Sequence, residues 1–274
     1  MNKKTYIISI VVLVAVIIVG SLAFMYYRGM VFSKEILSLE IIGSDAAKVG
    51  DQVEYTVKYK NNGNFTLEKP KISFELPDNS MNEDGKIRFE KELQNLDPGA
   101  TGSESFKGIL IGKENDQMVS KASLSYTPHN LSVRYESDAT FTTKIQEVPI
   151  DLNFDLPASL DQGKEMSFSV NYLSNIDYPL ENLSIKIDPI SDIMIKSADP
   201  SSLDKIEWKI GTLNKGDKGT ININGIVSPT SQDHVTFSAH LGMWQQSDFI
   251  ILKDINQDVT IIQHPASQEN SPIP

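Results

Sequence analysis

Residues 50–74, GDQVEYTVKYKNNGNFTLEKPKISF, decide the fold, because residues 163–187, GKEMSFSVNYLSNIDYPLENLSIKI, repeat their pattern at a displacement of 113 residues. Apolar and polar residues alternate in both stretches, as in a β-strand with one buried and one solvent-facing side. The buried side repeats position by position: Val53, Tyr55, Val57 and Tyr59 correspond to Met166, Phe168, Val170 and Tyr172. The chain therefore contains two copies of one all-β unit.

The match continues beyond these stretches at a displacement of 117 residues, where Gly99, Gly102 and Gly108 correspond to Gly216, Gly219 and Gly225. Helical periodicity is almost absent from both copies. Their length and alternation predict two tandem immunoglobulin-like β-sandwiches of roughly seven strands each, at 36–147 and 148–263. Residues 264–274, HPASQENSPIP, lack apolar periodicity and predict a disordered tail.

An uncharged apolar run, Thr5–Tyr27, precedes both copies and is long enough to cross a bilayer of roughly 30 Å as one helix. We expect an uncleaved signal anchor with residues 1–4 in the cytoplasm, a stem at 28–35 and the C-terminal domains outside the cytoplasm. The alternative is a secretory signal peptide cleaved after Ser21-Leu22-Ala23. The expected localisation is a single-pass protein of the cell membrane.

The charge of the chain excludes some classes of partner. Four of the 25 basic residues precede Glu35 and no acidic residue does, so the remainder carries 21 basic and 36 acidic side chains, a formal charge of −15. Such a surface repels phosphate backbones, so nucleic acid is not expected as a partner. The absence of cysteine excludes disulfides, thiolate metal sites and a cysteine nucleophile.

Two motifs carry a resemblance to a known family. The first is Gly50-x-x-Val53-x-Tyr55-x-Val57-x-x-x-x-Asn62-Gly63-Asn64, and the second is Trp208-x-Ile210-Gly211-x-Leu213-x-x-Gly216-x-x-Gly219. Together they resemble the bacterial surface repeats of immunoglobulin-like fold that include the CARDB-type cell-adhesion-related domains. The resemblance implies an anchored cell-surface role in adhesion or spacing, and it supplies no catalytic residue.

The second copy departs from the pattern at Ile176, where the turn glycine is expected, and the first copy has Phe89 where the second has Trp208. We expect Trp208 to face the core, with Phe89 in the same role in the first copy. Among the aromatic residues, Tyr178, Trp244 and Tyr135 are the candidates for exposed positions in loops.

No complete catalytic motif occurs in the sequence. Ser202-x-x-Lys205 stands without the companion motifs of penicillin-recognising enzymes, and His234 and His240 are too far apart along one strand to share a metal. We therefore expect a protein that is not an enzyme, in which the tandem domains form an adhesive or spacer stalk. The alternative is a ligand-binding or accessory subunit of a cell-envelope complex, with an envelope protein or glycan as partner.

Acidic residues are expected to gather where the first domain meets the second. The loops at that end carry Asp45, Asp51, Asp78, Glu83, Asp84, Glu114 and Asp116, with Glu147 and Asp151 beside the linker. Calcium takes six to eight oxygen ligands, and carboxylates from separate loops can supply them. Candidate ligands for calcium, the one cofactor considered, are Asp78, Glu83, Asp84 and Asp116; a solvated acidic rim is the alternative.

Overall fold

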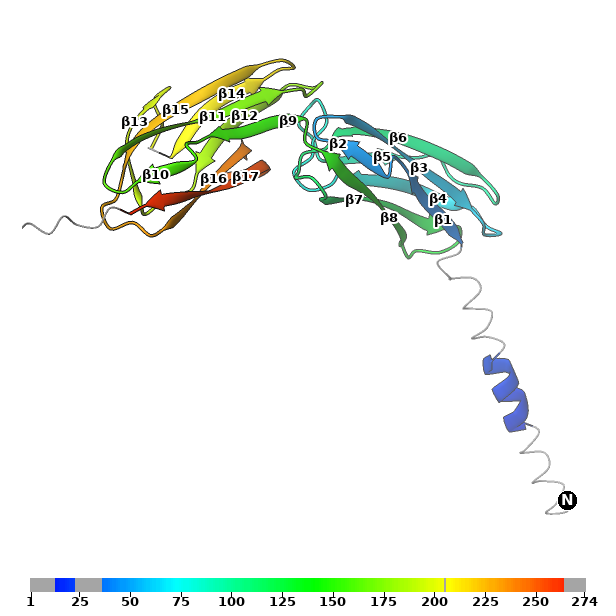
Figure 1. Cartoon of the computed structure of the whole chain (residues 1–274). Helices are drawn as coiled ribbons and strands as arrows, with labels where there is room; N and C mark the ends of the chain where they lie inside the picture. Colours follow the sequence, from blue (N-terminus) through cyan, green and yellow to red (C-terminus); the bar gives the residue numbers. More distant parts are fainter. Residues whose placement is uncertain (1–12, 23–35, 205, 264–274) are drawn as a thin grey trace, which may run out of the picture.

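The computed structural model describes residues 13–22, 36–204 and 206–263, and β-strands make up most of the second and third ranges (Figure 1). The strands form four sheets, two from the chain before Val148 and two from the chain after it. This arrangement confirms the all-β class that the alternation predicts. We call residues 36–147 domain 1 and residues 148–263 domain 2.

Each domain is a sequence of strands joined mostly by short turns. Domain 1 contains β1 (Leu37–Ile42), β2 (Ala46–Lys48), β3 (Gln52–Asn61), β4 (Leu67–Glu75), β5 (Arg88–Glu92), β6 (Thr101–Ile109), β7 (Gln117–Pro128) and β8 (Tyr135–Glu147). Domain 2 contains β9 (Ile150–Asp155), β10 (Ser159–Asp161), β11 (Glu165–Ser174), β12 (Leu180–Ile187), β13 (Ile193–Asp199), β14 (Glu207–Leu213), β15 (Lys218–Val227), β16 (His234–Gln245) and β17 (Asp248–Ile262).

The two domains share one topology. Domain 1 has the sheets β1-β3-β6 and β2-β8-β7-β4-β5, and domain 2 has the sheets β13-β15-β11-β9 and β10-β17-β16-β12-β14. In both domains the chain changes sheets after its first strand, so that β2 and β10 pair parallel to β8 and β17. The orders correspond strand for strand except for β13, which has no counterpart in domain 1.

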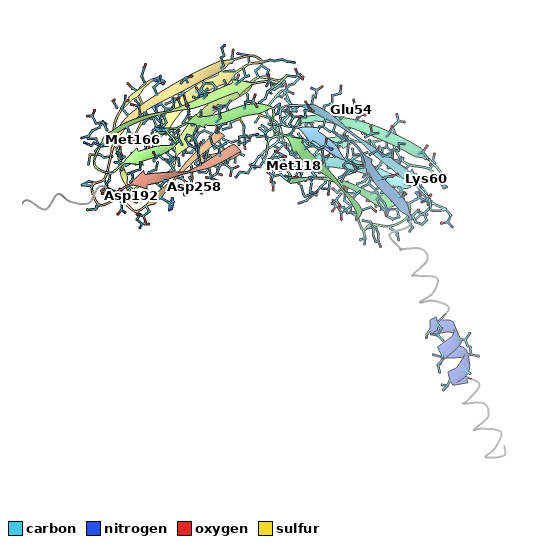
Figure 2. The ribbon with its side chains drawn as sticks, viewed as in Figure 1. Glu54, Lys60, Met118, Met166, Asp192 and Asp258 are labelled. Atoms are coloured by element: carbon cyan, nitrogen blue, oxygen red, sulfur yellow. The ribbon has the colours of Figure 1, made fainter. Side chains whose placement is uncertain are left out.

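The core follows the alternation read from the sequence. Tyr55 and Val57 of β3 are fully buried, while Glu54 and Lys60 lie on the solvent face of the same strand (Figure 2). Tyr59 lies opposite Gly102, and the equivalent pair in domain 2 is Tyr172 opposite Gly219. A Cβ atom at either glycine would collide with the tyrosine ring, which explains why glycine occurs in both copies.

Trp208 confirms one core prediction, whereas Phe89 contradicts another. Trp208 is 1% exposed, and its indole Nε1 donates a hydrogen bond to the carbonyl oxygen of Pro200 at 2.9 Å. Phe89 is only half-buried and lies opposite Phe74, whereas Trp208 lies opposite Ile185. Since the repeat pairs Phe74 with Ile187, the two aromatic residues occupy different positions, and their predicted equivalence is wrong.

The amino-terminal segment is described only in part. Residues 13–22 form a helix with exposed side chains, and the rest of the predicted span Thr5–Tyr27 lies outside the described residues. Within the described part of the chain, no helix has both the length and the apolar character needed to cross a membrane. The expected cytoplasmic residues 1–4, stem 28–35 and tail 264–274 also lie outside the described residues.

Candidate functional site

The junction between the domains is closed by side chains from both. The linker is short, since β8 ends at Glu147 and β9 begins at Ile150, and the amide of Asn175 donates to the carbonyl of Pro149 at 2.8 Å. Ile176 follows in the turn after β11 and is fully buried. A Cβ added to Gly50 of domain 1 would lie 2.6 Å from Cγ2 of Ile176, so the two domains are in contact at this point.

This contact explains why Ile176 departs from the repeat, in which domain 1 has glycine at the equivalent position. Its counterpart in domain 1 is Gly63, whose surroundings are Ile36 and Asn61 of its own domain. The same turn in domain 2 faces domain 1, and a branched apolar side chain fills the junction there. An ion pair, Lys113 Nζ to Asp254 Oδ2 at 3.5 Å, adds a polar contact between the domains.

A groove of about 600 Å³ opens beside this contact. Domain 1 contributes Met81, Asn82, Glu83, Gly85, Ile109 and Ile111, and domain 2 contributes Tyr178, Pro179, Leu180, Glu181, Asn182, Met243, Trp244, Gln245 and Gln246. Its buried members, Ile109, Ile111, Leu180 and Met243, are apolar, and its exposed members include the carboxylates of Glu83 and Glu181 as well as Tyr178 and Pro179. Ligand sites often lie at domain interfaces, and their volumes are about 300–1,000 Å³, so the groove is the candidate binding site.

Trp244 is held in place at one end of the groove. Its indole Nε1 donates to Oε1 of Glu207 at 2.7 Å, and the ammonium of Lys186 lies 4.1 Å from the centre of the ring. Phe249, across the hairpin, has its ring centre 5.3 Å away. These contacts fix the ring without an aromatic partner from domain 1, as expected for a preformed wall of a site.

The aromatic candidates from the sequence separate into two groups. Tyr178, which is 38% exposed, and Trp244 both line the groove. Tyr135 lies elsewhere, at the start of β8, with its ring 6.2 Å from that of Tyr126. The sequence could nominate Tyr178 and Trp244 as exposed aromatics, but it gave no sign that Met81, Ile109 and Ile111 of domain 1 would face them.

The four carboxylates predicted as calcium ligands lie in two hollows and an exposed turn. Glu83 lines the groove and accepts a hydrogen bond from Nε2 of Gln52 at 3.0 Å, whereas Asp78 and Asp116 line a separate hollow of about 270 Å³. Asp116 also accepts from the amide of Lys113 at 2.7 Å. Asp84 lies in an exposed turn, where its amide donates to Asn82.

Other acidic residues near the junction pair with groups of the chain itself. Glu147 lies 2.7 Å from Nζ of Lys48, and this hydrogen bond raises the pKa of the lysine. Asp51 accepts from the amide of Lys48 at 3.1 Å. Among the described residues, no three histidine, aspartate or glutamate side chains are grouped closely enough to hold a metal ion. Calcium binding by Asp78, Glu83, Asp84 and Asp116 stays a prediction.

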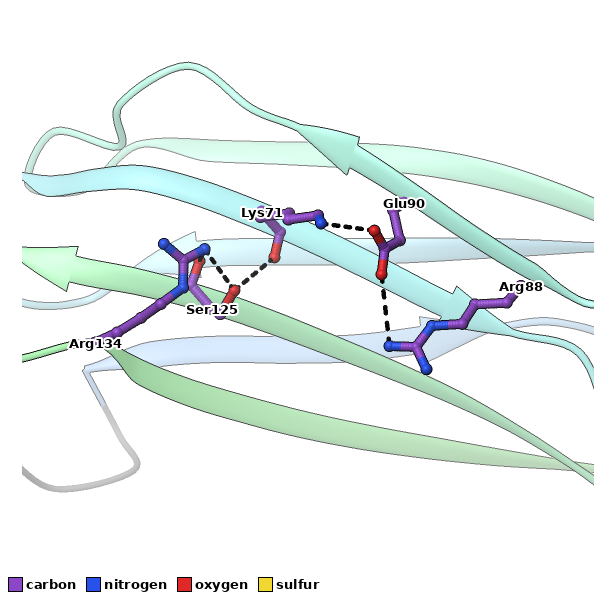
Figure 3. A network of polar contacts seen from close by, with 5 residues as sticks. All are labelled: Lys71, Arg88, Glu90, Ser125 and Arg134. Atoms are coloured by element: carbon purple, nitrogen blue, oxygen red, sulfur yellow. Dashed lines mark hydrogen bonds and ion pairs between the residues drawn. The ribbon is translucent and has the colours of Figure 1, made fainter.

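A second hollow, of about 1,050 Å³, lies on the outer face of the sheet β2-β8-β7-β4-β5. Figure 3 shows its polar network, in which Glu90 pairs with Lys71 at 2.6 Å and with Arg88 at 3.6 Å. Arg134 donates to Oγ of Ser125 at 2.7 Å. The Lys71 hydrogen bond lowers the pKa of Glu90, but the pair is exposed, and its charges satisfy one another across neighbouring strands.

The two histidines considered in the sequence, and two aspartates of β17, lie on strands or the surface. His234 is exposed, and His240 has Nε2 3.2 Å from Oδ1 of Asp188. Asp254 and Asp258 lie within β17, where Asp258 accepts from the hydroxyl of Thr236 at 2.6 Å. These residues therefore stabilise neighbouring strands.

Comparison with known proteins gives no family assignment. No protein-family model matches the chain, and no curated protein matches it. Among solved structures it is similar to red sea bream transglutaminase, with 9% identity and a TM-score of 0.39, covering 84% of this chain and 32% of that one. It is also similar to the CARDB domain of a Pyrococcus furiosus protein in complex with di-metal ions, with 20% identity and a TM-score of 0.29, covering 40% of this chain and 86% of that one.

A third structure is AvmM, described as catalysing macrocyclization in alchivemycin A biosynthesis, with 14% identity and a TM-score of 0.34 over 44% of this chain and 92% of that one. Enzymes among these similar structures contradict the prediction that this chain is not an enzyme, and we withdraw that prediction. The chain spans about a third of the length of the transglutaminase. At these identities and TM-scores the similarity assigns no activity to this chain.

Proposed function

We propose that this chain is a single-pass, membrane-anchored cell-surface protein whose two immunoglobulin-like β-sandwiches form an adhesive or spacer stalk. The observation that carries the proposal is the closed junction, where Ile176 is fully buried and its Cγ2 would lie 2.6 Å from a Cβ at Gly50. A short linker and an apolar contact make the pair stiffer than two domains on a flexible tether. Stiffness is what a spacer requires.

The proposed anchor is the apolar run Thr5–Tyr27, with domain 1 nearest the membrane and domain 2 outermost. Protease added to intact cells tests this topology. We expect it to remove both domains and to leave a fragment containing Thr5–Tyr27. Protection of the domains until the cells are lysed would reverse the orientation, and a mature amino terminus near Phe24 would replace the anchor with a cleaved signal peptide.

The second candidate function is that of a ligand-binding or accessory subunit of a cell-envelope complex, and the groove favours it. Tyr178 and Trp244 stand at the rim of an apolar floor that includes Ile109 and Met243. A pull-down from native envelope with the ectodomain as bait tests this candidate. Partners that wild type captures and that Tyr178→Ala loses would support it, provided that the matched variant Tyr135→Ala, outside the groove, still captures them.

A further inference from the structure

Strand β6 of domain 1 lies at the open edge of its sheet, although its counterpart in domain 2 does not. The sheet order β1-β3-β6 ends at β6, whereas β15 is flanked on both sides, by β11 and by β13. The extra strand β13 pairs antiparallel with β15 from Ile193 opposite Val227 to Asp199 opposite Asn222. In domain 2, β13 therefore covers the strand edge that is left open in domain 1.

The repeat identifies which part of β6 is left open. At the displacement of 117 residues, Val227 and Asn222 correspond to Leu110 and Ser105. In domain 1 the only pairing on this side, among the described residues, is an isolated bridge from Met81 to Ile109. The stretch from Ser105 to Gly108 thus has no strand beside it where β13 stands in domain 2.

The backbone groups of alternate residues in this stretch point toward the open side. Ile109 donates its amide to the carbonyl of Met81 at 2.8 Å and accepts from the amide of Met81 at 3.3 Å, so both of its backbone groups face away from β3. Backbone groups alternate in direction along an antiparallel strand. The amides and carbonyls of Lys107 and Ser105 consequently face the same open edge.

Apolar side chains accompany the open edge. Ile87 is 50% exposed and accepts a hydrogen bond from the amide of Leu76, whose side chain lies against Gly108 of β6. Phe89 and Phe106 are half-buried, with their ring centres 5.6 Å apart. The corresponding flank of domain 2 is closed: Ile223, the counterpart of Phe106, is 1% exposed, and the segment after β13 accepts the indole hydrogen bond of Trp208.

The charges that commonly protect an edge strand lie outside this stretch or point away from it. Glu104 and Lys91 form an ion pair at 2.6 Å, one position beyond Ser105. The ammonium of Lys107 lies 3.8 Å from Glu54 on the outer face of the sheet, since the two residues are cross-strand partners. Neither pair blocks the backbone groups of Ser105 and Lys107.

We propose that domain 1 binds an extended segment of a partner polypeptide, which adds to β6 as an antiparallel strand along Ser105 to Gly108. The chemistry of that partner is inferred from β13, in which Ile195 and Ala198 lie opposite β15. The partner segment should carry apolar or small residues at these two positions and no proline within the paired stretch. Main-chain hydrogen bonds to Ser105 and Lys107 would hold the segment, and its apolar side chains would cover Ile87 and Phe89.

The probe for this proposal is a synthetic peptide of residues 191–199, SDIMIKSAD, which contains the β13 sequence. We expect millimolar peptide to slow hydrogen–deuterium exchange of residues 101–109 in the full-length chain, measured in detergent by mass spectrometry. Exchange of β15, which already has its neighbouring strand, serves as the internal control. Unchanged exchange of residues 101–109 at saturating peptide would overturn the proposal.

Two proline variants locate the site. Lys107→Pro removes an amide that faces the open edge and makes no bond to β3, so the domain should fold while the protection by peptide is lost. Ser103→Pro is the matched control, because its amide faces the same way but lies beyond the stretch that β13 would cover. Protection lost in Lys107→Pro and retained in Ser103→Pro supports the proposal, and protection retained in both overturns it.

A third variant keeps the test decisive if Lys107→Pro does not fold. Ile87→Asn alters a half-exposed side chain, and we expect it to weaken peptide binding about tenfold, which corresponds to about 1.4 kcal/mol. Equal affinity for wild type and Ile87→Asn would contradict the proposal. Concentration-dependent dimerisation without peptide, abolished by Lys107→Pro, would make a second copy of this chain the occupant and would also overturn it.

Discussion

Replacing Gly50 with alanine should disturb the junction between the domains, and Gly163→Ala provides its matched control. The two glycines are equivalent in the repeat, and both have positive φ, +86° for Gly50 and +72° for Gly163. Alanine in this region costs roughly 1–2 kcal/mol at either position. The surroundings differ: a Cβ at Gly50 would lie 2.6 Å from Cγ2 of Ile176, whereas at Gly163 the nearest atom is Cβ of Pro229 at 4.0 Å.

The clash that Gly50→Ala creates with Ile176 cannot be relieved by moving a flexible side chain. Ile176 is branched at Cβ and fully buried, so the added methyl group must displace the domains or overpack the junction, at a typical further cost of roughly 1–3 kcal/mol. We expect Gly50→Ala to change the relative domain orientation, measured by NMR residual dipolar couplings, while Gly163→Ala only lowers the melting temperature of domain 2.

A second substitution separates the two effects of Gly50→Ala. Adding Ile176→Ala removes Cγ2 and should restore the original orientation without removing the backbone strain at position 50. Equal orientations in wild type, Gly50→Ala and Gly163→Ala would refute the view that Ile176 fills the junction.

Three further predictions concern stability, each measured by calorimetry. Trp208→Ala should cost about 3–5 kcal/mol, as usual for a buried tryptophan, and Phe89→Ala clearly less because Phe89 is half-buried; equal losses would contradict the strand assignment. Asn61→Ala should cost several kcal/mol, roughly 1–3 for each group left unpaired, because the buried amide of Asn61 bonds to the carbonyls of Phe65 and Leu96 and to the amide of Gly63. Burial raises the pKa of Tyr172. The stability that the neutral phenol contributes to the folded domain is therefore fully present below about pH 10 and is lost as the pH rises through the folded pKa. We expect this alkaline loss of stability to be smaller in Tyr172→Phe.

The strands and most of the core could be predicted from the sequence because alternation records which side of a strand is buried. Val53, Tyr55 and Val57 of β3, and their counterparts Met166, Phe168 and Val170 of β11, are buried as their alternation indicates. The site could not be predicted in the same way, because no periodicity indicates that Ile109 of domain 1 and Trp244 of domain 2 line one groove. Such contacts depend on how two folded domains pack against each other. The internal repeat shows only which residues of the two domains are equivalent, and not which residues touch.

The calcium prediction shows a related limit. Connectivity places the loops of Asp78, Glu83 and Asp116 near one end of domain 1, but it does not say where a carboxylate points. Asp116 accepts a local hydrogen bond from the amide of Lys113, and Glu83 accepts one from Gln52 of a neighbouring strand, so each carboxylate is oriented by its own partner.

At two places the copies diverge where their surroundings also differ. Ile176 replaces the turn glycine because that end of domain 2 meets domain 1, whereas the neighbours of Gly63, at the same position of domain 1, are Ile36, Asn61 and Phe65 of its own domain. Strand β13 closes one flank of domain 2, and in domain 1 that flank keeps Phe106 stacked on Phe74 at 4.6 Å and Ile87 half-exposed. Since the shared positions maintain one fold, the differences between the copies indicate where each domain has its own contacts, and the open β6 edge belongs to domain 1 alone.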